Sequence, residues 1–135
     1  MEEIKELHRE YLFLISGVDM EKALDCFAHD IQVDVANYGI RKGKDEVGKF
    51  FREIIYPNVL QSKDGHFTGQ PVIAVSEEKA SGHWMFYRFV QDPSTLRWVQ
   101  GRYDCEYAKE DGKWKFSLLK MMRPWPEFLG DTPQK

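Results

Sequence analysis

The segment from Ala80 to Arg123 constrains the fold more than any other part of the chain. It contains three long runs rich in aromatic and β-branched residues: Ala80–Gln91, Leu96–Lys109 and Lys113–Arg123. Two turn-forming clusters separate these runs, Asp92–Thr95 and Glu110–Gly112. Runs of this composition between such turns predict three consecutive antiparallel strands.

The middle run has two different faces, because side chains alternate across a strand. One face carries Trp98, Gln100, Arg102, Asp104 and Glu106, and the other carries Val99, Gly101, Tyr103, Cys105 and Tyr107. Neither face is purely apolar, and the first has three consecutive ionisable side chains. A long sheet that carries polar groups on a face which other elements can cover predicts that this face forms the wall of a ligand cavity.

Composition places the chain among ordinary globular proteins of one domain. It has 135 residues, of which 42% are hydrophobic and 30% charged. The net charge of −3 and the absence of a basic run argue against a nucleic-acid partner. The two cysteines, Cys26 and Cys105, lack metal-binding spacing, so we expect buried thiols and no metal site. No apolar run approaches the roughly 20 residues that span a membrane, so we expect a cytoplasmic protein without a membrane partner.

The first half of the chain predicts three helices and a short strand. The first helix covers Glu2–Ile15, with a buried stripe formed by Ile4, Leu7, Tyr11, Leu14 and Ile15. A second helix starts after Asp19 and ends near Asp30. The short strand is Ile31–Ala36, with Ile40–Arg41 as its hairpin partner. A third helix runs from Lys44 or Asp45 to Pro57.

A further strand, Gly65–Val75, contains Pro71, which predicts an edge position or a bulge because proline has no N–H for the ladder. These elements together predict an α+β fold.

Several motifs occur in an order and spacing that belong to a known family. They are Tyr11, Leu24–Asp30, Gly43, Gly65–His66, Ala80–Trp84, Gly101–Asp104 and Asp111–Lys115. The pattern resembles the SnoaL-like family of the nuclear-transport-factor-2-like superfamily over about residues 3–125, which leaves 126–135 as a C-terminal tail. The resemblance implies a single domain in which a curved antiparallel sheet forms a cone-shaped barrel with cystatin-like topology, closed by three helices around a small-molecule pocket. The same fold hosts cyclases, isomerases, dehydratases, epoxide hydrolases and proteins without catalytic activity.

Three residues are catalytic candidates. Tyr11 is either a core aromatic residue or a hydrogen-bond donor to a developing oxyanion, as in ketosteroid-isomerase-like and bile-acid-dehydratase-like members. His66 is either a surface residue or a base, and it resembles the histidine that abstracts or relays a proton in scytalone-dehydratase-like members. Asp104 either faces the cavity near Tyr11 as a protonated donor, or is held ionised by Arg88, or pairs with Arg102 on a solvated face.

Six residues are candidates for substrate binding: Arg88, Arg102, Asp34, Tyr38, Trp84 and Tyr103. Asp34 is a solvated strand carboxylate if the neighbouring valines face the core. The dehydratase-like pattern is incomplete, because Ser16 and Arg88 stand where those members carry aspartates. The last strand has no acidic residue, which argues against epoxide hydrolysis.

Two functions remain open from the sequence. The first is a cofactor-independent lyase, isomerase or cyclase-like enzyme that acts on a small apolar oxygenated ring compound, with His66 as base and Tyr11 as donor. The second is a non-catalytic binding protein for a small hydrophobic or carboxylate-bearing ligand, anchored by Arg88 or Arg102. In both cases we expect a homodimer through the outer face of the meander, because Met85, Tyr87 and Phe89 add aromatic and apolar surface that one cavity cannot hide.

Overall fold

A computed structural model describes residues 2–35, 38–57, 65–91 and 96–122 of the chain. Within these ranges, the side chains of residues 65–67, 70, 88–91 and 96–99 are not described. The turn expected at Asp92–Thr95 and the tail expected at 126–135 lie outside the described residues. None of the helices in the described ranges is both long and apolar enough to cross a bilayer.

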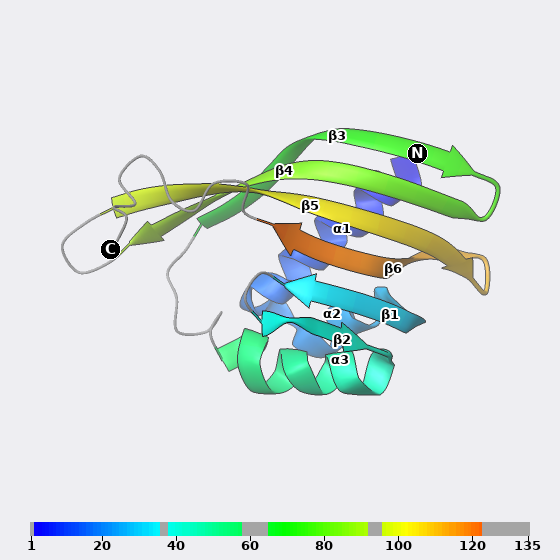
Figure 1. The fold of residues 1–135 in the computed structure, drawn as a ribbon, viewed down its shortest axis with the longest axis horizontal. Coiled ribbons are helices and arrows are strands. Elements are labelled where there is room, and N and C mark those ends of the chain that lie inside the picture. Colours follow the sequence, from blue (N-terminus) through cyan, green and yellow to red (C-terminus); the bar gives the residue numbers. More distant parts are fainter. Residues whose placement is uncertain (1, 36–37, 58–64, 92–95, 123–135) are drawn as a thin grey trace.

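Six strands form one curved sheet in the order β2-β1-β6-β5-β4-β3 (Figure 1). Their bounds are Phe27–Val35 for β1, Ile40–Lys42 for β2, Gly65–Ser76 for β3, Lys79–Gln91 for β4, Leu96–Glu110 for β5 and Lys113–Met122 for β6. Neighbouring strands are antiparallel except β1 and β6, which are parallel. The long meander predicted from Ala80 onward is confirmed as β4, β5 and β6.

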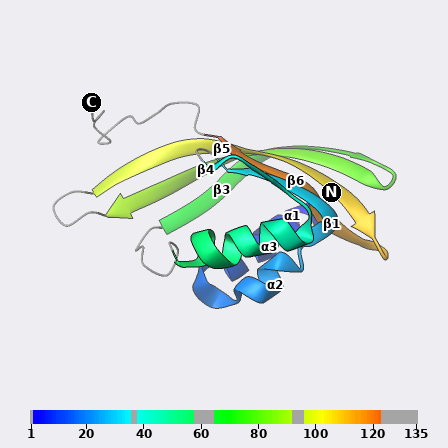
Figure 2. The same ribbon diagram turned by 60° about the horizontal axis from the view of Figure 1, so that its bottom comes forward.

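Three α-helices lie on the concave side of this sheet, as Figure 2 shows. Their bounds are Glu2–Phe13 for α1, Met20–Leu24 for α2 and Lys44–Phe50 for α3. A kinked segment, Leu14–Val18, follows α1, and Gly17 in it has a φ of 100° that favours glycine. The second helix begins after Asp19 as predicted, and the carboxylate of Asp19 caps it by accepting a hydrogen bond of 3.1 Å from the backbone N–H of Lys22. The predicted α+β fold with three helices closing a curved sheet is confirmed.

The boundary between α2 and β1 differs from the sequence prediction. The second helix ends at Leu24 rather than near Asp30, and the strand begins at Phe27 rather than Ile31. The cause is tertiary: the backbone N–H of Phe116 donates to the carbonyl of Cys26, and Phe27 and Phe116 are paired residues of β1 and β6. Pairing with a strand nearly ninety residues away therefore overrides the local helical pattern.

Pro71 occupies the position that its chemistry predicts. Its strand, β3, lies at one edge of the sheet, and the register with β4 shifts between Gly69 and Val72. The missing N–H of proline therefore falls at an edge and at an irregularity of the ladder. Both parts of the prediction are confirmed.

The core fills the space between the concave face and the helices. Its largest fully buried side chains include Phe27, Phe51, Phe86, Tyr107 and Phe116. Alternation in β5 sends Gly101, Tyr103, Cys105 and Tyr107 inward, whereas Arg102 and Glu106 are exposed on the outer face. The sheet thus has a buried aromatic face and an outer polar face.

Candidate functional site

One face of α1 packs directly against the concave side of the sheet. Ile4, His8, Tyr11 and Leu14 are the buried residues of this stripe. Positions 4, 8 and 11 follow one another at spacings of four and three, which places them on one side of a helix. The apolar spacing of the sequence predicts Ile4, Tyr11 and Leu14 in this stripe but not His8, because histidine is not an apolar residue.

His8 is the buried polar side chain at the centre of this contact. Its side chain is stacked on Trp84, with ring centroids 4.1 Å apart and an interplanar angle of 13°, and it meets Tyr103 edge-on at 5.4 Å. The residue is 1% exposed, and neither ring nitrogen has a hydrogen-bond partner among the described residues. Burial lowers the pKa of His8 from 6.5 to about 3 because a charged imidazolium would lose its hydration. The ring is therefore neutral at physiological pH.

Tyr11 lies one helical turn after His8 in the same buried layer. Its ring lies 5.1 Å from that of Phe116 and 5.5 Å from that of Phe27. Burial, together with the nearby Tyr103, raises the pKa of Tyr11 well above its ordinary value. Its hydroxyl therefore keeps its proton and can donate a hydrogen bond.

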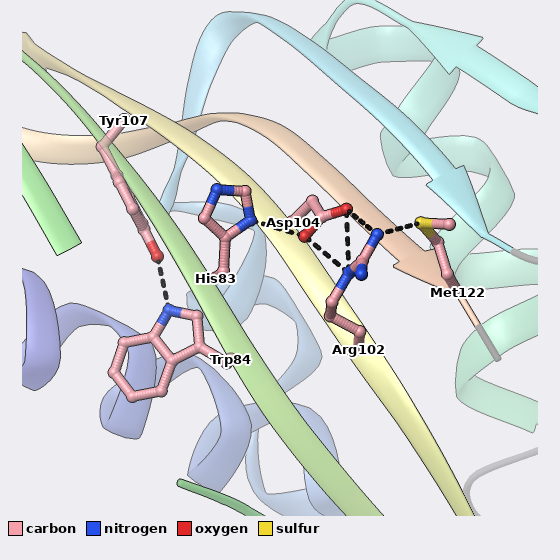
Figure 3. A network of polar contacts seen from close by, with 6 residues as sticks. All are labelled: His83, Trp84, Arg102, Asp104, Tyr107 and Met122. Carbon is pink, nitrogen blue, oxygen red and sulfur yellow. Dashed lines mark hydrogen bonds and ion pairs between the residues drawn. The ribbon is translucent and has the colours of Figure 1, made fainter. Parts of the chain in front are cut away.

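A second polar contact lies behind His8, on the sheet itself. The indole N–H of Trp84 donates to the hydroxyl of Tyr107 over 3.0 Å, as Figure 3 shows. Burial also raises the pKa of Tyr107 and of the Cys105 thiol, so both stay protonated. Cys26 and Cys105 are buried free thiols, as predicted. The hydrogen bond from Trp84 to Tyr107 fixes the orientation of the indole on which His8 stacks.

Asp104 belongs to a different cluster, on the outer face. His83 Nδ1 lies 2.6 Å from its carboxylate, and the guanidinium of Arg102 lies 3.0 Å from it (Figure 3). Partial burial acts to raise the pKa of Asp104, but the hydrogen bonds from His83 and Arg102 outweigh it and hold the pKa below its ordinary value. Asp104 is thus ionised and faces away from Tyr11. The alternative of a protonated Asp104 donor inside the cavity is wrong, and the pair with Arg102 is the arrangement found.

Three further candidates, Trp84, Tyr103 and Asp34, divide between the two faces. Trp84 and Tyr103 are buried on the concave face. Asp34 lies on the outer side, because Val33 and Val35 on either side of it are buried, and Tyr38 is exposed, with its ring 5.7 Å from that of Phe50.

The backbone of His66 in β3 is paired with that of Arg88 in β4. The side chains of these two residues lie outside the described part of the chain.

Comparison of the sequence with models of known protein families shows which family the chain belongs to. A family model described as "SnoaL-like domain" matches residues 1–120. The chain belongs to the SnoaL-like family. No curated protein matches its sequence.

Solved structures similar to this SnoaL-like domain share its fold at low sequence identity. An NTF2-like protein of unknown function from Pseudomonas putida KT2440 has a TM-score of 0.80 and 16% identity, over 98% of this chain and 95% of that one. A scytalone dehydratase-like protein from Novosphingobium aromaticivorans DSM 12444 has a TM-score of 0.77 and 17% identity, over 100% and 93%. The hexachlorocyclohexane dehydrochlorinase LinA-type3 from Novosphingobium barchaimii LL02 has a TM-score of 0.76 and 19% identity, over 92% and 86%. Identities this low establish the NTF2-like, cystatin-like fold and no particular chemistry.

Metal-ligating side chains gather at one place among the described residues of the SnoaL-like domain. His29, Asp30 and Glu110 offer ligand atoms within 4.8 Å of one another. Glu110 already accepts hydrogen bonds of 2.8 Å from the backbone N–H of His29 and lies 2.8 Å from its ring nitrogen. His29 and Asp30 are exposed at the start of β1, and Glu110 is half-buried at the end of β5. The group is separate from the buried layer around His8.

Proposed function

We propose that this SnoaL-like domain is a cofactor-independent enzyme of the lyase or isomerase type, which acts on a small apolar oxygenated ring compound by proton abstraction. The observation that carries the proposal is the unpartnered ring of His8. A buried hydrogen-bonding group without a partner costs about 1–3 kcal/mol, so most buried groups of this kind have a hydrogen-bond partner. A hydroxyl or carbonyl group of a bound ring compound would supply one, within an aromatic layer suited to an apolar body.

His8 itself is not the base in this proposal. A pKa of about 3 gives its imidazole little driving force to accept a proton at neutral pH. Its part is to orient the substrate through a hydrogen bond, next to Tyr11. The protonated phenol of Tyr11 is the donor that would stabilise negative charge on the substrate oxygen.

The base in the proposal is His66. In the ladder between β3 and β4, Thr68 is paired with Phe86, and His66 is paired with Arg88 two residues further along. Phe86 is buried under the concave face. Because positions two apart share a side of a strand, we propose that His66 faces the same side of the sheet as Phe86.

Two similar structures carry the names of a dehydratase and a dehydrochlorinase. Both names denote removal of a small molecule from a substrate, which agrees with proton abstraction as the class of reaction. Arg102 is engaged by Asp104 on the outer face, so a purely ligand-binding protein would have to use Arg88 as its anchor. The binding protein is the alternative that the following experiment separates.

Turnover by two histidine variants tests the proposal. Small cyclic ketones and hydroxylated aromatic compounds are screened with wild type, His66→Gln and the control His29→Gln, whose side chain is exposed outside the buried layer. Losing a general base costs on the order of 10²–10⁴ in rate. We expect this loss in His66→Gln, with ligand affinity retained, and wild-type rates in His29→Gln.

Equal turnover by wild type and His66→Gln would remove His66 as the base. Binding of these compounds by wild type without turnover of any of them would favour the non-catalytic alternative.

A further inference from the structure

A group of metal-ligating side chains lies where β1 begins and β5 ends, at the same end of the sheet (Figure 1). It consists of His29, Asp30 and Glu110, whose ligand atoms lie within 4.8 Å of one another. One imidazole and two carboxylates make a mixed set of donors, in contrast to a surface cluster of carboxylates alone. The expectation of no metal site rests on the spacing of the two cysteines, and neither cysteine belongs to this group.

An irregularity in β1 brings the first two ligands to the same surface. Neighbouring side chains in a regular strand point to opposite faces of the sheet. His29 and Asp30 are nevertheless both exposed, and the two residues before them are both buried. The register between β1 and β6 shifts in this stretch, between Phe27 and Gln32. A shift of this kind, like a β-bulge, turns a side chain away from the face that alternation assigns to it.

Glu110 is held beside this pair through one of its two carboxylate oxygens. Its Oε2 accepts a hydrogen bond of 2.8 Å from the backbone N–H of His29 and lies 2.8 Å from the ring Nδ1 of the same residue. Neither its Oε1 nor the carboxylate of Asp30 has a hydrogen bond or ion pair among the described residues. Two carboxylate groups are therefore open to a further ligand.

The distances in this group fit a small divalent cation. Zn²⁺ binds imidazole nitrogen and carboxylate oxygen at about 2.0–2.2 Å, so neighbouring ligand atoms of a tetrahedral site are about 3.3 Å apart. The separation of 2.8 Å between Nδ1 and Oε2 is shorter than this, and the limit of 4.8 Å for the whole group is longer. The side chain of His29 is 82% exposed, so it can rotate to close the difference without disturbing the core.

The donor set and the local charge select the kind of cation. Ca²⁺ and Mg²⁺ take oxygen ligands, whereas imidazole is a ligand of Zn²⁺ and other transition metals. The two carboxylates carry two negative charges, and the nearby Lys44 supplies one positive charge, so the group stays negative when the imidazole is neutral. We propose that His29, Asp30 and Glu110 form a surface site for Zn²⁺ or a similar divalent transition-metal ion, with water completing its coordination.

An ion in this site joins two segments that are 81 positions apart in the sequence, the start of β1 and the end of β5. Because the three ligands come together only in the folded chain, the ion stabilises the fold by mass action. The site lies outside the buried layer around His8. It therefore takes no part in the proposed proton abstraction, which stays cofactor-independent.

Isothermal titration calorimetry with ZnCl₂ tests the site on untagged protein that has been treated with a chelator and dialysed. We expect wild type to bind one Zn²⁺ per chain. The affinity is expected to fall at least about tenfold in each of His29→Gln, Asp30→Asn and Glu110→Gln. These substitutions keep the size of the side chain, and the amide oxygen of Glu110→Gln still accepts the backbone hydrogen bond from His29.

His83→Gln is the matched control. His83 is also an exposed histidine beside a carboxylate, with its Nδ1 2.6 Å from Asp104, but the third member of that cluster is Arg102 rather than a second carboxylate. We expect this variant to bind Zn²⁺ like wild type. Unfolding followed by circular dichroism should show a midpoint temperature that Zn²⁺ raises in wild type and in His83→Gln but not in His29→Gln.

A second measurement locates the ion in wild type alone. In ¹H–¹⁵N correlation spectra recorded during a Zn²⁺ titration, we expect the largest shifts at the amides of His29, Asp30 and Glu110, and an excess of Ca²⁺ should not reverse them. Absence of Zn²⁺ binding by wild type, equal affinity in wild type and His29→Gln, shifts centred elsewhere in the chain, or displacement of Zn²⁺ by Ca²⁺ would each overturn the proposal.

Discussion

His8 shows how much one side chain determines in this domain. It has the helical spacing of a core residue and the chemistry of a polar one, and the fold buries it against Trp84 and Tyr103 without a partner for either nitrogen among the described residues. Tyr11 could be predicted because tyrosine belongs to an apolar stripe. His8 could have been found by the same spacing, four residues after Ile4 and three before Tyr11, had polar residues been included in the pattern.

The burial of His8 predicts a pH-dependent stability. The native state keeps the ring neutral down to its pKa of about 3, whereas the unfolded chain takes up a proton below about 6.5. Between these values the unfolded state binds one more proton, so the free energy of unfolding falls as the pH falls, by about 1.4 kcal/mol per pH unit.

We expect His8→Leu to remove this contribution, so that its loss of stability from pH 7 to pH 5 is about 2 kcal/mol smaller than that of wild type. Urea denaturation of both proteins at the two pH values measures it. Parallel pH dependences in wild type and His8→Leu would contradict the neutral buried imidazole.

At the scale of elements, the strands of the meander could be predicted nearly to the residue. Their alternation, their β-branched and aromatic content and their turns are all local signals. The start of β1 could not be predicted in this way, because it depends on the pairing of Phe27 with Phe116 of β6. The side of the sheet on which Asp104 lies also needed the structure, because both faces of β5 carry polar residues in the sequence.

Packing between two strands predicts the effect of one small substitution. Gly101 of β5 is paired with Phe86 of β4, and a Cβ at position 101 would lie 2.4 Å from the Phe86 ring and 2.7 Å from the carbonyl of Met122. Overpacking of this kind costs about 1–3 kcal/mol. We expect Gly101→Ala to lower the free energy of unfolding by this amount in urea denaturation.

Gly69→Ala is the matched control, because a Cβ there meets nothing within 4 Å. It should stay within about 0.5 kcal/mol of wild type or gain slightly. Equal losses in the two variants would show that contact with Phe86 is not the cause.

For the whole molecule, the sequence motifs pointed to the right family, and the α+β fold with three closing helices followed from it. Fold alone does not decide chemistry, because this architecture hosts many activities. What the structure adds is a division of the polar residues: His8 and Tyr11 lie under the sheet, whereas Asp34, Arg102 and Asp104 lie on its outer face.

The most direct test of the central claim is the pH dependence of kcat/KM on the best substrate found in the screen. If a neutral histidine at position 66 accepts the proton, the wild-type kcat/KM rises with pH as the imidazole loses its charge, and then levels off. In His66→Gln the residual activity should be lower by on the order of 10²–10⁴ and should not show this rise. A His66→Gln profile that keeps the wild-type rise would contradict proton abstraction by His66.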